Sequence, residues 1–210
     1  MKIFSPDSKI YRFMVRFTDC VKLNFLWLLC SLPLVTFGAS TAAAFSVSMK
    51  MLKDEEGHIG ADFFKAFREN LKQGIAMSFI TAICAWVLYL DFQIFNTAAE
   101  HNTVFLIIGI IAAYVFSFSL LYSFALIARY ENTLLNTIRN SFRISMKFFL
   151  RSLLLLIVIA AETAVFIWNT KTLIIGLLIG PVLVISTISW TANGIFAKLE
   201  KEPGSTDTSK

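Results

Sequence analysis

Two carboxylates, Asp91 and Glu162, are the residues of this chain whose type and setting could do chemistry. Each interrupts a long apolar stretch, where a charge near mid-membrane costs roughly 3 kcal/mol and usually faces a cavity or a partner. Each lies about five or six residues, or about 8 Å, from the nearer end of its stretch. Trp168 and Asn169 follow Glu162 and offer stacking and hydrogen bonding to a sugar. We therefore expect a polar pathway or ligand site formed by these four residues.

A structural interpretation of the same residues stays open. Asp91 is close enough to the end of its stretch to be solvated, and Glu162 is protonated or bonded to a neighbouring helix. Tryptophans near the end of a span commonly anchor it at the membrane interface.

No other pattern of reactive residues points to catalysis. His58 and His101 fall in different loops, and Cys20, Cys30 and Cys84 show no Cys-x-x-Cys spacing. The sequence has no phosphate-binding Gly-rich loop and no His-Glu-x-x-His or Gly-x-Ser-x-Gly motif. We predict a non-enzymatic protein with no catalytic residue, no metal and no cofactor.

Composition indicates a membrane protein. Of 210 residues, 57% are hydrophobic and only 16% are charged, and the mean hydropathy is +0.69. A soluble domain carries about 25% charged residues. Because a helix pairs its own backbone groups in lipid, we expect an all-α, polytopic membrane domain. Four spans of roughly 20 residues are evident, at 74–95, 104–128, 148–168 and 173–196.

The distribution of basic residues orients these spans. Segments 49–73 and 129–151 carry five basic residues each, whereas 96–103 carries none and 169–172 carries only Lys171. Since cytoplasmic loops are enriched in Lys and Arg, the two basic segments are predicted to be cytoplasmic. The same bias explains the net charge of +5, so no nucleic-acid partner is expected.

The N-terminal region needs an even number of crossings, because residues 1–22 are also basic. Pro33 and Gly38 divide the next apolar stretch, which predicts helices at roughly 10–32 and 39–53 joined by a turn near the outer side. This gives six membrane segments, with both termini cytoplasmic. The second helix is short for a crossing, at about 21 Å, so a re-entrant hairpin stays open.

The small residues at 39–44 allow close approach to a neighbouring helix.

Two further expectations concern the ends of the chain. The basic start with an apolar stretch also fits a secretory signal, but charges at Arg16 and Lys22 reach the apolar core and argue against it. We expect one membrane domain over 1–198 and a flexible cytoplasmic tail over 199–210.

Two basic segments resemble each other. Residues 63–72 align without gaps on 134–143, with apolar residues at i, i+1, i+4 and i+8 and basic residues at i+5 and i+9. This spacing predicts amphipathic cytoplasmic helices near 61–73 and 132–147, each running into a long span. They either rest on the anionic leaflet or form a platform for a partner protein.

Several residues in the first third of the chain resemble the signature of the YesL-like family of uncharacterised bacterial membrane proteins. The resemblance covers roughly 20–75 and includes Asp62-Phe63 together with Asn24, Pro33, Thr36, Gly38, Phe64, Phe67 and Asn70. It implies a multi-pass protein of the bacterial inner membrane, often encoded beside carbohydrate importers of the ATP-binding-cassette type and sensor kinases.

Taken together, these features lead us to expect an accessory or regulatory partner of a carbohydrate importer or its sensing system. The importer permease and the sensor kinase are the expected protein partners, besides the lipid bilayer. The alternative is a small stand-alone transporter with an outward cavity near Asp91 and Glu162.

Overall fold

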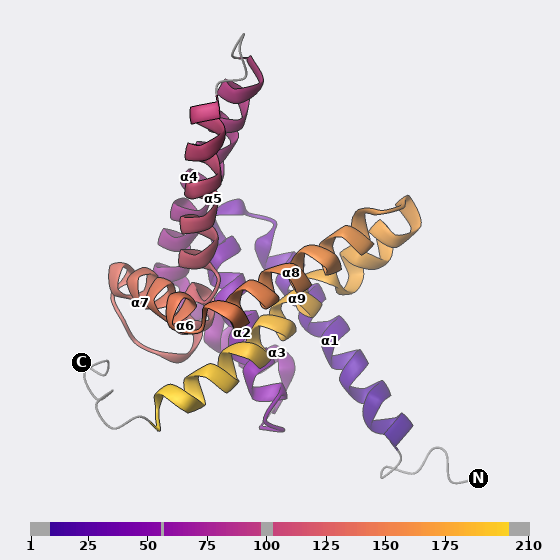
Figure 1. Ribbon diagram of the computed structural model, residues 1–210. Coiled ribbons are helices and arrows are strands. Elements are labelled where there is room, and N and C mark those ends of the chain that lie inside the picture. The colour runs from indigo at the N-terminus through magenta and orange to yellow at the C-terminus, as the bar shows by residue number, and fades with distance from the viewer. Residues whose placement is uncertain (1–8, 56, 98–102, 202–210) are drawn as a thin grey trace.

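The computed structural model describes residues 9–55, 57–97 and 103–201, and its regular elements are all helical, as predicted (Figure 1). The elements are α1 (Lys9–Ser31), the short 3-10 helix η1 (Leu34–Thr36), α2 (Phe37–Met51), α3 (Ile59–Glu69), α4 (Leu71–Thr97), α5 (Thr103–Leu120), α6 (Ser123–Arg129), α7 (Leu134–Lys147), α8 (Phe149–Ile167) and α9 (Thr170–Leu199).

Four helical stretches in the described residues are long and apolar enough to cross a membrane. They are Leu71–Thr97, Leu106–Arg129, Phe149–Ile167 and Thr170–Leu199, and they correspond to the four predicted spans. Neither α1 nor α2 qualifies, so the count of six membrane segments is not confirmed.

The spans form two helical hairpins that diverge from a shared centre. Figure 1 shows α4 and α5 running together in one direction, and α8 and α9 in another. Both hairpins pack on α2, through α4 and α9 respectively. The centre of the molecule is therefore the short helix α2 rather than a bundle of the spans.

Helix α2 is buried almost throughout, although it is only 15 residues long. Residues Ala39 to Ala44 have between 0 and 7% of their surface exposed. Gly38 and Gly74 form the closest approach of α2 to α4, and a Cβ atom on either glycine would overlap the other helix. The expected role of this run of small residues, close helix packing, is confirmed.

The turn between α1 and α2 does not lie where we predicted it. The predicted break at Pro33 is confirmed, whereas Gly38, which was expected to divide the stretch with it, lies inside α2. Leu34 and Val35 lie against Ser78 and Ala82, near the middle of α4. Helix α4 continues to Thr97, which is roughly 22 Å further along its axis. The turn therefore falls well short of the far end of the spans, because α2 is too short to reach it.

A proline in α9 explains one residue of the family signature. Pro181 has no N–H, which leaves the carbonyl of Leu177 without its helical partner. The side chain of Asn24, on α1, donates a hydrogen bond to this carbonyl at 2.9 Å and accepts one from the N–H of Val182 at 3.3 Å. Asn24 is only 1% exposed, so it joins α1 to α9 by satisfying backbone groups that lipid cannot.

Backbone groups at the break between α5 and α6 also receive hydrogen bonds from side chains, in this case from serines of α7. The buried side of α7 carries Thr137, Ser141 and Ser145. Ser145 donates to the carbonyl of Phe118 at 2.8 Å, and Ser141 accepts from the N–H of Tyr122 at 3.1 Å. Helix α3 instead buries Ile59, Phe63 and Ala66 against α1 and α2. The two amphipathic helices are confirmed, but their buried faces differ.

We predict that the effect of Asn24→Leu depends on Pro181. In the native chain, the change leaves the Leu177 carbonyl buried without a donor and should lower the free energy of unfolding by about 1 to 2 kcal/mol. In a Pro181→Ala background, the restored N–H pairs with that carbonyl, so the same change should cost clearly less. Unfolding of the purified protein in detergent measures both values.

Thr18→Val is the matched control, because Thr18 also lies on α1 and its hydroxyl donates to the carbonyl of Met14 within the same helix. An equal cost of Asn24→Leu in both backgrounds would contradict the proposed role of the amide.

Candidate functional site

The basic segments of the sequence meet on one side of the molecule. Lys50 and Lys53, at the end of α2, share a cavity of about 210 Å³ with Arg129 of α6 and Asn193 of α9. Basic residues from two separate segments of the sequence therefore lie close together in the structure.

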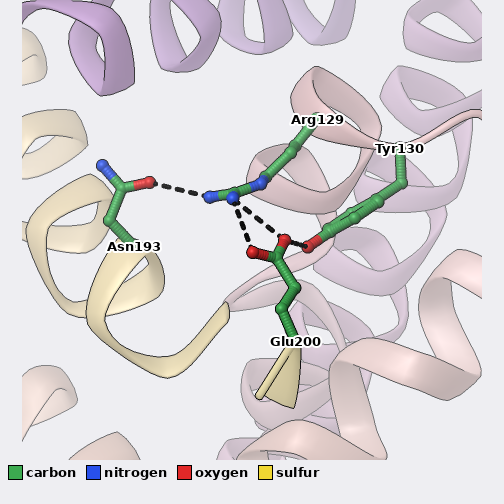
Figure 2. Close-up of polar contacts among 4 residues, drawn as sticks. All are labelled: Arg129, Tyr130, Asn193 and Glu200. Atoms are coloured by element: carbon green, nitrogen blue, oxygen red, sulfur yellow. Dashed lines mark hydrogen bonds and ion pairs between the residues drawn. The ribbon is translucent and has the colours of Figure 1, made fainter. Parts of the chain in front are cut away.

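Arg129 is the centre of a polar network that links α6 to the end of α9 (Figure 2). Its guanidinium donates to both carboxylate oxygens of Glu200, at 2.9 and 3.2 Å, and to the side-chain oxygen of Asn193 at 3.2 Å. The hydroxyl of Tyr130 donates to Glu200 at 2.7 Å. One guanidinium nitrogen, Nη2, makes both contacts with the carboxylate, and together with the Asn193 and Tyr130 hydrogen bonds they link the end of α9 to α6.

Two aromatic rings flank the Arg129 guanidinium, while the Glu200 side chain stays 49% exposed. The guanidinium carbon of Arg129 lies 5.6 Å from the ring centre of Phe196 and 5.7 Å from that of Tyr130. Burial and the hydrogen bond to Glu200 raise the pKa of Tyr130 to about 12. Tyr130 therefore stays a protonated hydrogen-bond donor at physiological pH.

A cavity of about 230 Å³ adjoins the network. Asn132, Asn140 and Arg143 line it together with Tyr130 and Glu200. These groups can bind a polar or charged partner, but none of them forms the nucleophile and base pair that covalent catalysis requires.

Sequence reasoning missed this network. The sequence places Arg129 in a basic segment and predicts that Glu200 belongs to a flexible tail, whereas α9 runs to Leu199 and Glu200 is held at its end. Arg129 and Glu200 are 71 residues apart, so no local pattern connects them. Residues 202–210 of the predicted tail lie outside the described residues.

The structure does not bring the two intramembrane carboxylates into one site. Asp91 is on α4, with its carboxylate against Gly109 of α5, where any Cβ atom would overlap it. Glu162 is on α8 and accepts a hydrogen bond from Thr187 of α9 at 2.8 Å. Since the two hairpins diverge, a shared outward cavity between these carboxylates is not supported.

Trp168 and Asn169 lie at the tip of the second hairpin, between α8 and α9. Trp168 is 88% exposed at the end of α8. Asn169 begins α9 in a capping box with Thr172, whose hydroxyl accepts from the N–H of Asn169 at 3.0 Å. The predicted sugar-binding set is therefore distributed over two hairpins, and Asn169 satisfies a helix terminus.

One carboxylate oxygen remains unsatisfied. Oε2 of Glu162 is buried and has no hydrogen-bond partner among the described residues, while Oε1 accepts from Thr187. The interpretation that Glu162 bonds a neighbouring helix is confirmed.

The residues of the family signature stabilise the N-terminal half. The Thr36 hydroxyl donates to the carbonyl of Cys30 at 2.7 Å across the Pro33 turn, and the Gly38 N–H donates to Ser78 at 2.7 Å. Asn70 is the single residue between α3 and α4, and its side chain donates to the carbonyl of Ala66 at 2.9 Å.

The aromatic members of the signature are divided between core and surface. Phe67 stacks on the fully buried Phe63 at 6.2 Å and is partly buried, whereas Phe64 is 43% exposed. Of the two signature residues Phe64 and Phe67, Phe64 therefore offers more surface to a partner.

Residues 20–92 match the DUF624 family model, which describes a protein of unknown function. The DUF624 match spans most of α1, α2, α3 and most of α4, and it contains every residue of the signature. It agrees with the predicted resemblance to an uncharacterised membrane-protein family. No curated protein and no solved structure matches the chain.

Within the DUF624 region, Asp62 fixes the loop between α2 and α3. Its carboxylate accepts a hydrogen bond from Lys50 at 3.0 Å and one from the N–H of Gly57 at 3.3 Å. In the same loop, Asp54 forms an ion pair with Arg16 of α1. These contacts make Asp62 a structural residue of the loop rather than a reactive one.

No three His, Cys, Asp or Glu side chains among residues 9–55, 57–97 and 103–201 lie close enough to hold a metal ion. His101 lies outside the described residues, so its predicted separation from His58 is not tested.

The contribution of Asp62 to stability should depend on pH. The hydrogen bond from Lys50 lowers the pKa of Asp62 below its usual value. Its stabilising effect is therefore complete above the unfolded-state pKa of about 3.9 and is lost as the pH falls through the lower folded-state pKa. Because both side chains are partly exposed, we expect Asp62→Asn to lower the free energy of unfolding by at most about 1 kcal/mol at neutral pH.

Melting temperatures across a pH series would measure this effect. The difference between wild type and Asp62→Asn should narrow below about pH 4. Glu69→Gln, which changes an exposed carboxylate on the same helix, is the control. A difference that stays constant with pH would show that the carboxylate charge has no role.

Proposed function

We propose that this protein is a non-enzymatic component of the bacterial cytoplasmic membrane that acts as an accessory or regulatory partner of another membrane protein. The YesL-like resemblance suggests that this partner is the permease of a carbohydrate importer or an associated sensor kinase. The observation that carries the proposal is an apolar face of α4 that the chain itself leaves uncovered.

This face begins where α2 ends. Helix α2 packs on α4 through Gly74 and Ser78, and the turn before α2 lies beside Ala82. The same face continues through Ala85, Tyr89 and Phe92, which are all exposed, with Tyr89 at 50% and Phe92 at 62%. A partner helix fits along this continuation because Ala82 and Ala85 leave room for its backbone and the two aromatic rings provide contact area.

The two hairpins have little contact with each other within one copy of the chain. Only 11% of the apolar window of α4 and 11% of that of α8 is buried. Among the described residues, neither α4 nor α5 is one of the main packing partners of α8 or α9. Two hairpins that pack so little on each other are better suited to assembly with another membrane protein than to enclosing a path between them.

We propose that α1 and α2 form a re-entrant hairpin that enters and leaves the membrane on the cytoplasmic side. The position of the turn beside the middle of α4 supports this topology. A hairpin of this kind adds no net crossing, which agrees with the basic residues at the N-terminus and after α2. Both termini, α3, α7 and the Arg129 network are then cytoplasmic.

A stand-alone transporter is the weaker candidate. Its support is the buried, unpartnered Oε2 of Glu162. A path lined by both carboxylates would have to join two diverging hairpins, so we favour the accessory role.

A pull-down of the tagged, native protein in a mild detergent tests the accessory role. We expect an importer permease or a sensor kinase to co-purify at stoichiometric yield. Changing Tyr89 and Phe92 to Ala should reduce this yield at least about tenfold, which corresponds to about 1.4 kcal/mol of lost contact.

The matched control changes Ile110 and Ile111 to Ala, because both are similarly exposed but lie on α5. Loss of the partner in both double variants would remove the assignment to α4. Recovery of the wild-type protein alone, with sugar uptake by vesicles that contain no other protein, would favour the transporter.

Cysteine labelling tests the topology. In a background with Cys20, Cys30 and Cys84 replaced by Ser, a membrane-impermeant maleimide should label Lys9→Cys and Lys65→Cys from the cytoplasmic side. Lys171→Cys should label from the opposite side. Labelling of positions 9 and 171 from the same side would mean that the α1–α2 region crosses the membrane an odd number of times.

A further inference from the structure

A groove between α8 and α9 lies apart from the proposed partner-binding face, because no residue of α4 lines it. It has a volume of about 700 Å³ and also reaches the residues that follow α2. It exists because one wall lacks bulk: at Gly194 of α9, an added Cβ atom would meet nothing within 4 Å. Thr187 and Thr191 continue this wall with small side chains.

The walls of the groove are largely apolar. Leu154, Leu155 and Val158 lie along α8, and Trp190 faces them from α9. Leu154 is 61% exposed and Trp190 is 71% exposed, so the chain leaves these surfaces uncovered. A wall of this kind, formed by residues spaced three and four apart on each helix, is complementary to a hydrocarbon chain.

Two cations lie at one end of the same groove. Lys53 comes from the turn after α2, and Arg151 comes from the first turn of α8. Both are exposed, and neither forms an ion pair with any residue in the described part of the chain. Asp54, the neighbour of Lys53, is engaged by Arg16 instead.

The groove lining also has a clear electrostatic bias. No Asp or Glu is among the described residues that line it. A ligand with a phosphate would be paired with Lys53 and Arg151, whereas an additional amine on its headgroup would find no carboxylate there. The lining therefore favours an anionic headgroup over a zwitterionic one.

We propose that this groove binds one anionic glycerophospholipid, with its phosphate between Lys53 and Arg151 and an acyl chain along the apolar wall. A free phosphate would leave the apolar wall uncovered, and a neutral lipid would leave the two cations unpaired. In the cytoplasmic orientation proposed above, the lipid comes from the inner leaflet, where anionic headgroups attract basic residues.

Binding of this lipid would link parts of the chain that have few contacts of their own. Lys53 follows the central helix α2, whereas Arg151 begins α8, and α2 and α8 are not among the main packed pairs of helices in the described residues. A phosphate held by both side chains would connect the centre of the molecule to the second hairpin.

Native mass spectrometry of the full-length protein tests the proposal. The protein is exchanged into detergent with equal amounts of phosphatidylglycerol and phosphatidylcholine. We expect wild type to retain one phosphatidylglycerol in clear preference to phosphatidylcholine. The double variant Lys53→Gln, Arg151→Gln should lower this preference by about tenfold or more. The control Lys65→Gln, Arg139→Gln removes the same charge from exposed positions outside the groove and should keep the preference.

A second variant separates a lipid from a free anion. Gly194→Phe places a ring in the groove without removing a cation, and it should reduce retention of phosphatidylglycerol while the melting temperature shows that the protein is folded. An equal preference in the double variant and its control would overturn the proposal. Displacement of the lipid by inorganic phosphate, together with unchanged binding in Gly194→Phe, would assign the two cations to a free-phosphate site and would also overturn it.

Discussion

The close packing of α2 at the centre of the molecule is the constraint on which the other elements depend. Lipid is as apolar as leucine, so helices in a membrane gain little from hiding apolar surface from it and rely on close contact and hydrogen bonds. Glycine and alanine provide this contact in α2, and Gly74 provides it on the facing helix. Both hairpins are positioned by it, because α4 of the first hairpin and α9 of the second both pack on α2.

A second requirement, that every buried backbone group has a partner, explains several of the polar side chains in the interior. Breaks in the helices create unpaired groups at the Pro33 turn, at Pro181 and at the junction of α5 with α6. Asn24, Thr36 and the serines of α7 supply the missing partners. These side chains are thus structural in this protein, and their hydrogen bonds replace those that water provides in a soluble domain.

The sequence was sufficient to predict features that depend on local pattern. Hydropathy located the four spans, Pro33 located the break between α1 and α2, and the amphipathic spacing located α3 and α7. Features that depend on tertiary contacts could not be predicted from the sequence. Nothing near Arg129 indicates Glu200, the depth of the Pro33 turn depends on how α2 packs, and the separation of Asp91 from Glu162 depends on the divergence of the hairpins.

The link between Asn24 and Pro181 also has a consequence for how the protein is made. Asn24 belongs to the first helix and its backbone partners belong to the last, 153 and 158 residues later. While the chain is being inserted, the amide of α1 has no native partner until α9 has entered the membrane. The first helix and the buried α2 must therefore be sheltered by the insertion machinery or by transient contacts, and the native centre of the molecule closes only when synthesis is almost complete.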